Sequence, residues 1–88
     1  MDKNLPEKKF RAGAVTATVW KNEQTGEKGD YVYFTVSVER NYKDKAGNWQ
    51  KTNSFRAADL PKVALVTNKA YEYLVLKEQG EDIEVEVI

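Results

Sequence analysis

The sequence predicts an α+β domain in which an antiparallel sheet of about four strands precedes one long C-terminal helix, in the order ββββα. Alternation of apolar and polar residues fills most of residues 10–55 and indicates strands. One long apolar segment follows Pro61 and indicates a helix. The length of 88 residues allows a single core made of a sheet and a helix.

The first strands are expected after a polar N-terminal arm. Residues 1–9 hold three lysines and Pro6, which predicts a mobile segment. Residues 10–21, FRAGAVTATVWK, alternate as a strand does, and Gly13 marks either a bulge or a break between two short strands. Residues 22–30, NEQTGEKGD, contain two glycines and no apolar side chain, so we expect a loop there.

The strongest strand signal is residues 31–42, YVYFTVSVERNY, which are rich in β-branched and aromatic residues. Their even positions form the expected core face, Val32, Phe34, Val36 and Val38. DKAG at residues 44–47 predicts a turn, because it begins with Asp and ends with Gly. Residues 49–55 then return as a further strand, with Phe55 pointing inward.

A helix is expected to begin with Asp59 as its N-cap and Pro61 in its first turn, and to end near Gly80. Its apolar residues cover more than the single stripe of about 100° that one buried face requires, so we expect self-association through the helix. The predicted homodimer interface is Val66, Ala70, Tyr73 and Leu74. Residues 10–77 would form the binding domain, and residues 78–88 an acidic tail or edge strand.

Composition excludes several kinds of chemistry. The chain has no cysteine and no histidine, which removes disulfides, thiol catalysis, the usual zinc sites and histidine acid–base catalysis. Its carboxylates are scattered singly, so we expect no enzyme activity, cofactor, metal or small-molecule substrate. No apolar run approaches the roughly 20 residues of a membrane span. We expect a protein of the cytoplasm, associated with the nucleoid, or of the nucleus.

The net charge of zero hides an uneven distribution. Residues 1–77 hold all 14 Lys and Arg against 9 Asp and Glu, whereas residues 78–88 hold five acids and no base. An excess of positive charge, as in residues 1–77, is typical of proteins that bind a partner carrying phosphates. The acidic tail is read either as a solvated segment or as one that binds a partner in place of DNA.

The face of the predicted sheet opposite the core is rich in hydroxyls and aromatic rings. Such a face suits single-stranded nucleic acid, because bases stack on rings while hydroxyls and cations hold phosphates. Thr18 is one of its hydroxyls. Phosphate contacts are predicted for Arg11, Lys21, Arg40, Lys43, Lys45, Lys51 and Arg56, and base stacking for Trp20, Tyr33, Tyr42 and Trp49. The alternative is an ordinary strand exterior, since Thr, Tyr and Trp have high β-propensity.

Four short motifs, FRAG, TVSV, DKAG and AADLPK, occur in an order that resembles the single-stranded-DNA-binding domain of the positive cofactor four family of transcriptional coactivators, and more distantly the plant Whirly proteins. The likeness covers Phe10 to Leu76. It implies a strongly curved sheet backed by a helix, dimers formed through the helices, and channels for single-stranded DNA of low sequence specificity. By this matching Tyr42 is the stacking aromatic before the turn. Glu39 stands where the family has an arginine, with Arg40 beside it.

We therefore expect a homodimer that binds single-stranded DNA without catalysis and largely without sequence preference, serving transcription, replication or repair, with single-stranded RNA as a second candidate ligand. A rival of another class is a protein-interaction module that docks through its apolar helix and acidic tail. A rival of the same function is an oligonucleotide-binding β-barrel, which the long helix after the strands disfavours.

Overall fold

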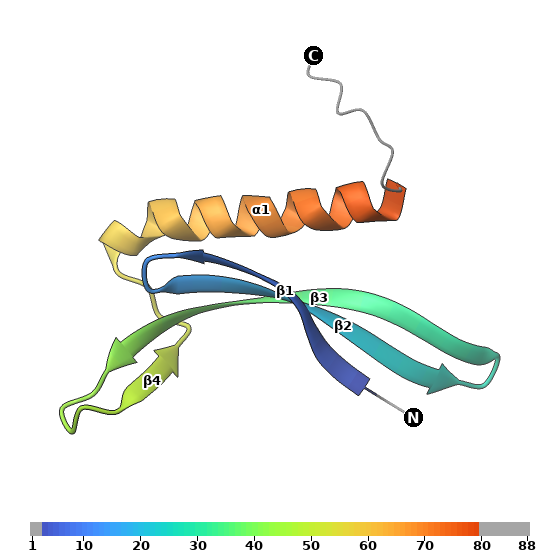
Figure 1. Cartoon of the computed structure of the whole chain (residues 1–88), viewed down its shortest axis with the longest axis horizontal. Helices are drawn as coiled ribbons and strands as arrows, with labels where there is room; N and C mark the ends of the chain where they lie inside the picture. The colour runs from blue at the N-terminus through green and yellow to red at the C-terminus, as the bar shows by residue number, and fades with distance from the viewer. Residues whose placement is uncertain (1–2, 80–88) are drawn as a thin grey trace, which may run out of the picture.

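The computed structural model describes residues 3–79 and confirms the order ββββα (Figure 1). One antiparallel sheet has the strand order β1-β2-β3-β4, so each strand pairs with its neighbour in the chain. A short 3₁₀ turn, η1, leads into the helix. The elements are β1 Lys3–Ala12, β2 Val15–Gly26, β3 Gly29–Lys43, β4 Trp49–Thr52, η1 Ala57–Asp59 and α1 Leu60–Gln79.

The first two strands are longer than the sequence predicts. Gly13 lies in the turn between β1 and β2 with φ of 60°, so it marks a break rather than a bulge. The prediction of a loop over residues 22–30 was wrong, because β2 runs to Gly26 and β3 starts at Gly29. Lys21 to Gln24 pair with Tyr31 to Phe34. Pairing with β3 holds these polar residues in the sheet, although they lack the apolar alternation of a typical strand.

The prediction of a mobile arm over residues 1–9 was also wrong from Lys3 onward, because residues 3–9 are part of β1. The register shifts between Pro6 and Lys8, which leaves Glu7 in a bulge. The Glu7 carboxylate accepts a hydrogen bond from the Tyr73 hydroxyl at 3.2 Å and pairs with the Lys77 ammonium at 3.1 Å. The hydrogen bond to Glu7 raises the pKa of Lys77. Through both contacts of Glu7, β1 is connected to the helix.

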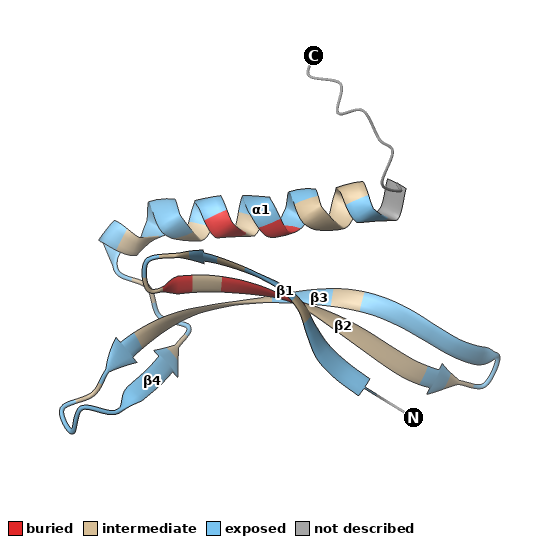
Figure 2. Ribbon diagram, viewed as in Figure 1, coloured by how far each residue is buried: buried red, intermediate tan, exposed pale blue. Residues whose placement is uncertain are grey.

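The core lies between α1 and the first two strands, and it is small (Figure 2). The buried apolar residues are Val15, Ala17, Val19, Val66 and Ala70. Of the expected core face of β3, Phe34 and Val38 pack against this cluster. Val32 and Val36 do not, since they are 50% and 41% exposed. The reason is that α1 packs mainly on β1 and β2 and touches β3 little.

The predicted dimer interface faces the sheet of the same chain. Val66 and Ala70 are 2% and 1% exposed, and Tyr73 and Leu74 pack against the same cluster. These residues recur at helical spacing and form the one stripe that the sheet buries. Val66 and Ala70 are therefore covered by the sheet of their own chain and are not open to a partner, whereas Tyr73 and Leu74 stay partly exposed. Exposed large apolar side chains of α1 are Leu60, Leu65 and Tyr71.

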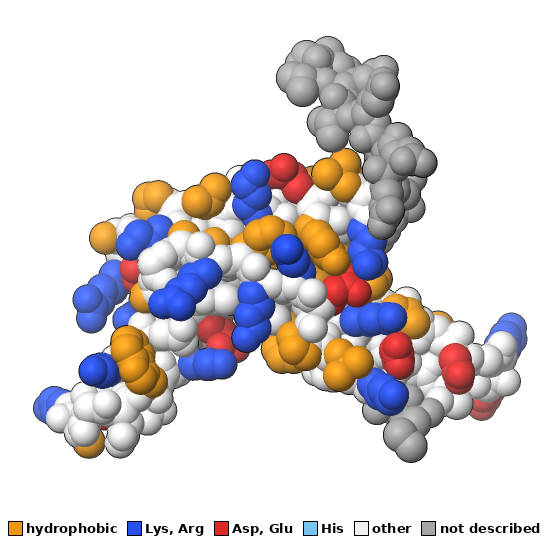
Figure 3. All heavy atoms as spheres, viewed as in Figure 1, with side chains coloured by type: hydrophobic (Ala, Val, Ile, Leu, Met, Phe, Trp, Pro, Cys, Tyr) orange, Lys and Arg blue, Asp and Glu red, His pale blue; other side chains and the backbone are white. Residues whose placement is uncertain are grey.

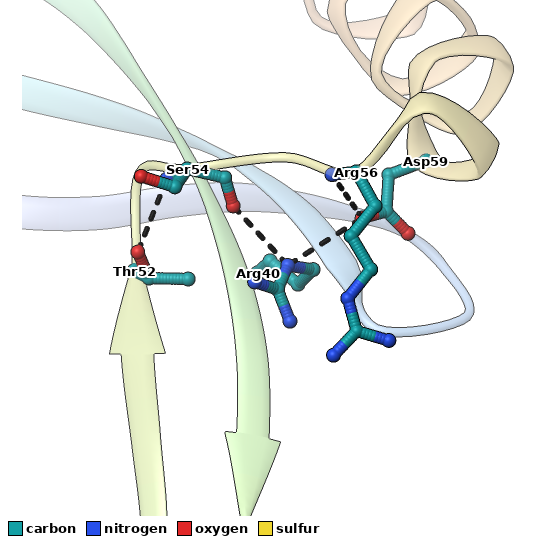
Figure 4. Close-up of polar contacts among 5 residues, drawn as sticks. All are labelled: Arg40, Thr52, Ser54, Arg56 and Asp59. Carbon is teal, nitrogen blue, oxygen red and sulfur yellow. Dashed lines mark hydrogen bonds and ion pairs between the residues drawn. The ribbon is translucent and has the colours of Figure 1, made fainter.

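The start of the helix is fixed by contacts to β3. Asp59 is not the N-cap of α1 but the last residue of η1, and its carboxylate accepts the Arg56 backbone N–H at 2.8 Å. The Arg40 Nε lies 3.4 Å from the same carboxylate oxygen and donates to the Ser54 carbonyl at 3.2 Å (Figure 4). Arg40 thus joins β3 to the segment after β4. Phe55 packs against the core as expected, although β4 ends at Thr52.

Residues 80–88 lie outside the described part of the chain. The acidic tail or edge strand was expected over residues 78–88, but its first two residues belong to α1, which runs to Gln79. The rest of that segment, and the helix end expected near Gly80, fall on residues 80–88.

Candidate nucleic-acid interface

The sheet has one face without a helix, which we call the outer face. Ladder partners share a face, and Val15, Ala17 and Val19 point to α1, so the alternate residues of β2 and their partners point away from it. The register extends this face from the β2–β3 hairpin to the β3–β4 hairpin. Of the predicted site residues it carries Arg11, Thr18, Trp20, Tyr33, Lys43, Trp49 and Lys51.

The other predicted site residues lie elsewhere. Lys21, Arg40 and Tyr42 belong to the helix side of the sheet, because Lys21 pairs in the ladder with Phe34 and Arg40 with Val15. Lys21 is 3.5 Å from Glu23, and Arg40 is held by Asp59. Lys45 lies in the turn between β3 and β4, and Arg56 lies between β4 and η1.

The tip of the β3–β4 hairpin is built on Asp44. Its Oδ1 accepts the backbone N–H groups of Ala46 and Asn48 at 3.0 and 2.9 Å, and its Oδ2 accepts the Gln50 amide at 3.2 Å. The bonds from Asn48 and Gln50 hold the pKa of Asp44 below its usual value of 3.8. Gly47 closes the turn with φ of 86°. The predicted DKAG turn is confirmed, and it fixes the position of the strand that begins with Trp49.

The hairpin places one ring and one cation together on each face of the sheet. On the outer face, the Lys43 ammonium lies 5.4 Å from the centroid of Trp49, which is 69% exposed. On the helix side, the Arg40 guanidinium lies 5.7 Å from the centroid of Tyr42. Each pair lies within the roughly 6 Å range of a cation–π contact. The two aromatic residues predicted to share one platform are therefore on opposite sides of the sheet.

A second group of rings lies at the other end of the outer face. Tyr33 and Tyr31 stack with centroids 6.0 Å apart and ring planes at 26°. Trp20 is partly buried and donates its indole N–H to the Ser37 hydroxyl at 2.8 Å. Exposed or half-exposed rings thus lie at both ends of the outer face, and rings of this kind are surfaces on which unpaired bases can stack.

Between these two ends the outer face has a hollow of about 200 Å³. Cations, hydroxyls, one amide and one carboxylate surround it, from Lys9, Arg11, Thr16, Thr18, Glu39, Asn41 and Lys51. The Glu39 carboxylate lies 3.7 Å from the Lys51 ammonium. Lys9, Thr16, Glu39 and Asn41 are not among the predicted site residues. The pairing of Thr16 with Glu39 and of Asn41 with Lys51 brings them together, and that register is the signal that sequence alone did not supply.

Charge is unevenly spread over the two ends of the molecule. Lys and Arg side chains predominate around β1 and the β3–β4 hairpin, whereas toward the β2–β3 hairpin acidic and basic side chains are mixed (Figure 3). Within residues 3–79, no group of three or more His, Cys, Asp or Glu side chains is placed to hold a metal ion. Nor does the described part of the chain contain a helix with the length and apolar character needed to cross a membrane.

No protein-family model, curated protein or solved structure matches this chain. The resemblance to the positive cofactor four family stays a prediction, carried by the motifs quoted above.

Proposed function

We propose that this protein binds single-stranded DNA on the outer face of its sheet, without catalysis and largely without sequence preference. The observation that carries the proposal is Trp49, a tryptophan 69% exposed beside the Lys43 ammonium, at one end of a helix-free face with further cations and hydroxyls. The biological setting would be any process that exposes unpaired strands: transcription, replication or repair, in the nucleoid or the nucleus.

Two kinds of contact would supply the affinity. Bases stacked on Trp49 and on Tyr33 contribute about 1–3 kcal/mol each, and every base offers a π face, so this term tolerates any sequence. The ammonium and guanidinium groups of Lys9, Arg11, Lys43 and Lys51 would neutralise phosphates and release counterions. A duplex would bind more weakly, because its bases are already stacked on one another.

The homodimer remains a prediction, and the helix surface through which it would form differs from the one predicted from the sequence. Since Val66 and Ala70 are buried within the chain, a partner would meet the outward side of α1, where Leu65 and Tyr71 are 52% and 67% exposed. Association through the helix would leave the outer face of each sheet open to DNA. Single-stranded RNA stays a second candidate ligand, because stacking and phosphate contacts do not read the sugar.

The same exposed side chains favour a second candidate function. Leu60, Leu65 and Tyr71 leave three large apolar side chains of α1 exposed, and in this alternative they would contact a protein partner. In this alternative the protein docks on another protein through α1, and the outer face is ordinary exterior. Added salt separates the two functions, because binding to phosphates weakens steeply with salt and an apolar interface hardly responds.

The test is a titration of the full chain with a short single-stranded oligonucleotide, followed by tryptophan fluorescence at two salt concentrations, with a duplex of the same sequence as the control. We expect quenching, tighter binding of the single strand, and a steep loss of affinity with salt. Trp49→Ala lacks the exposed indole, so its affinity is measured by anisotropy of a labelled oligonucleotide. The substitution should weaken binding roughly tenfold, the effect of one lost stacking contact.

Tyr42→Ala is the matched control, because Tyr42 lies on the same hairpin but on the helix side of the sheet. It should leave the affinity within about twofold of the wild type, well below the loss of one stacking contact. Circular dichroism of both variants checks that the domain stays folded. Unchanged binding by Trp49→Ala would contradict the proposed function.

A further inference from the structure

Glu39 raises a question about the outer face, because a carboxylate there opposes the binding of a polyanion. Its side chain is 34% exposed and lies on the wall of the hollow described above, next to Thr16 in the ladder and 3.7 Å from Lys51. A phosphate placed against this carboxylate would be repelled. A bound strand must therefore turn some other group toward Glu39.

The shape and lining of the hollow indicate which group that is. Its volume of about 200 Å³ is below the roughly 300–1,000 Å³ usual for sites that enclose a whole small ligand, so it has room for a group of the size of one base rather than for a length of strand. Cations stand at β1 and β4, at the margins, while the Thr16 and Thr18 hydroxyls come from β2, in the middle of the sheet. Phosphates would lie along the margins and a base edge against the middle.

We propose that this hollow receives a single base of the bound strand and that Glu39 selects guanine in it. The inference rests on the proposed single-stranded-DNA binding and adds a local base preference to it. A glutamate carboxylate only accepts hydrogen bonds, and its two oxygens can take a pair of neighbouring donors. Guanine alone among the DNA bases offers two adjacent N–H donors on its Watson–Crick edge, at N1 and N2.

The other bases match Glu39 less well. Thymine has one N–H between two carbonyl oxygens, which the carboxylate repels. Adenine and cytosine each offer an amino group next to an acceptor nitrogen, so only one carboxylate oxygen finds a donor. Unpaired bases are read on these edges in single strands. Asn41, whose amide both donates and accepts, stands on the same wall two residues along β3 and can bond the remaining carbonyl of the base.

The experiment measures affinity by fluorescence anisotropy with labelled oligonucleotides of about 12 nucleotides, a length within the usual site sizes. One strand is all thymine, and the others carry guanine, hypoxanthine, adenine or cytosine at the same positions. Hypoxanthine is the informative ligand, because it keeps the N1–H and the carbonyl of guanine but lacks the N2 amino group. We expect the guanine strand to bind roughly tenfold more tightly than thymine, the size of one bidentate contact, and hypoxanthine to lose much of that gain.

In Glu39→Gln, the affinities for the guanine and hypoxanthine strands should agree within about twofold. The thymine strand should bind more tightly than it binds the wild type, because a repulsive charge is removed. Glu23→Gln is the matched control. It removes the same charge from a glutamate that is 35% exposed and 3.5 Å from a lysine, but lies on the helix side of the sheet with Lys21. Its base preference should equal that of the wild type.

A wild type that binds all strands equally, or a Glu39→Gln variant that binds every strand more tightly by the same factor, would overturn the guanine pocket while leaving single-strand binding intact. Failure of the wild type to bind any of the strands would overturn the proposed function itself, and the pocket with it.

Discussion

The two long hairpins of the sheet share one architecture and differ in what their rings contact. In the β2–β3 hairpin, Tyr31 and Tyr33 stack on each other, and residues 21–34 carry two cations and three acids. In the β3–β4 hairpin the ring of Trp49 faces a lysine ammonium instead, and residues 39–56 carry five cations and two acids. A ring already stacked on another ring has one face less to offer. A ring beside a cation presents both a stacking surface and a charge for the phosphate attached to the stacked base.

The largest expected effect comes from reversing charge on one hairpin at a time. Lys43→Glu with Lys51→Glu should lower the affinity for a single-stranded oligonucleotide by more than roughly tenfold, and should reduce the slope of log K against log salt by at least about 1.4, the value for two lost phosphate contacts. Lys21→Glu with Lys28→Glu makes the same change on the other hairpin and should cost much less. Equal losses from the two pairs would mean that the hairpins do not differ in function.

The next effect concerns the ion pairs of the two hairpins, of which the Arg40–Asp59 pair links the β3–β4 hairpin to the turn before the helix and the Lys21–Glu23 pair lies within β2. Arg40→Ala removes the ion pair with Asp59 and the bond to the Ser54 carbonyl from a site where both charged side chains are largely covered, 15% and 13% exposed. We expect the free energy of unfolding to fall by about 1–2 kcal/mol, as measured by urea denaturation. Lys21→Ala breaks the more exposed pair with Glu23 on the β2–β3 hairpin and should cost below about 0.5 kcal/mol. A loss no larger for Arg40→Ala would show that this link does not stabilise the fold.

The smallest expected effect is confined to the tip of the β3–β4 hairpin. Because hydrogen bonds lower the pKa of Asp44 in the folded state, the ordering that they provide is present above the unfolded pKa near 3.8 and is lost as the pH falls through the lower folded value. Amide chemical shifts of Ala46 and Asn48 followed by NMR during acid titration should report this change. Asp44→Asn, which keeps an acceptor oxygen, should preserve the neutral-pH shifts and remove their pH dependence, whereas Asp44→Ala should alter them at every pH.

The sequence was enough to predict the element order because two local signals are strong in it. Alternation over residues 31–42 specifies a strand without reference to its neighbours, and Pro61 followed by an apolar run specifies a helix. The polar segments at Lys3 to Lys9 and Asn22 to Gly26 lack such signals. They are strands because a partner strand takes up their backbone hydrogen bonds, and that is a property of the fold rather than of the segment.

The sequence could predict the candidate site only where it also showed on which face of its strand each side chain lies. Alternation along β2 placed Thr18 and Trp20 on the outer face, but the register of β3 with β4 was needed to separate Trp49 from Tyr42. A shift of one residue moves a side chain to the opposite face, and residue type does not reveal which parity applies. The helix posed the same difficulty, because several of its stripes are apolar and only the packed structure shows that Val66 and Ala70 meet the sheet.

The bulge at Glu7 has a consequence for how separate molecules behave toward one another. β1 is a margin of the sheet, and an unbroken ten-residue margin would offer its free N–H and C=O groups to the strand of a neighbouring copy. Pro6 lacks an N–H, the bulge shifts the spacing of the groups that follow, and Lys8 and Lys9 bring like charges together on any approaching copy. A chain with zero net charge has no long-range repulsion to keep it dispersed, so this irregular margin is a local defence against fibrous aggregation.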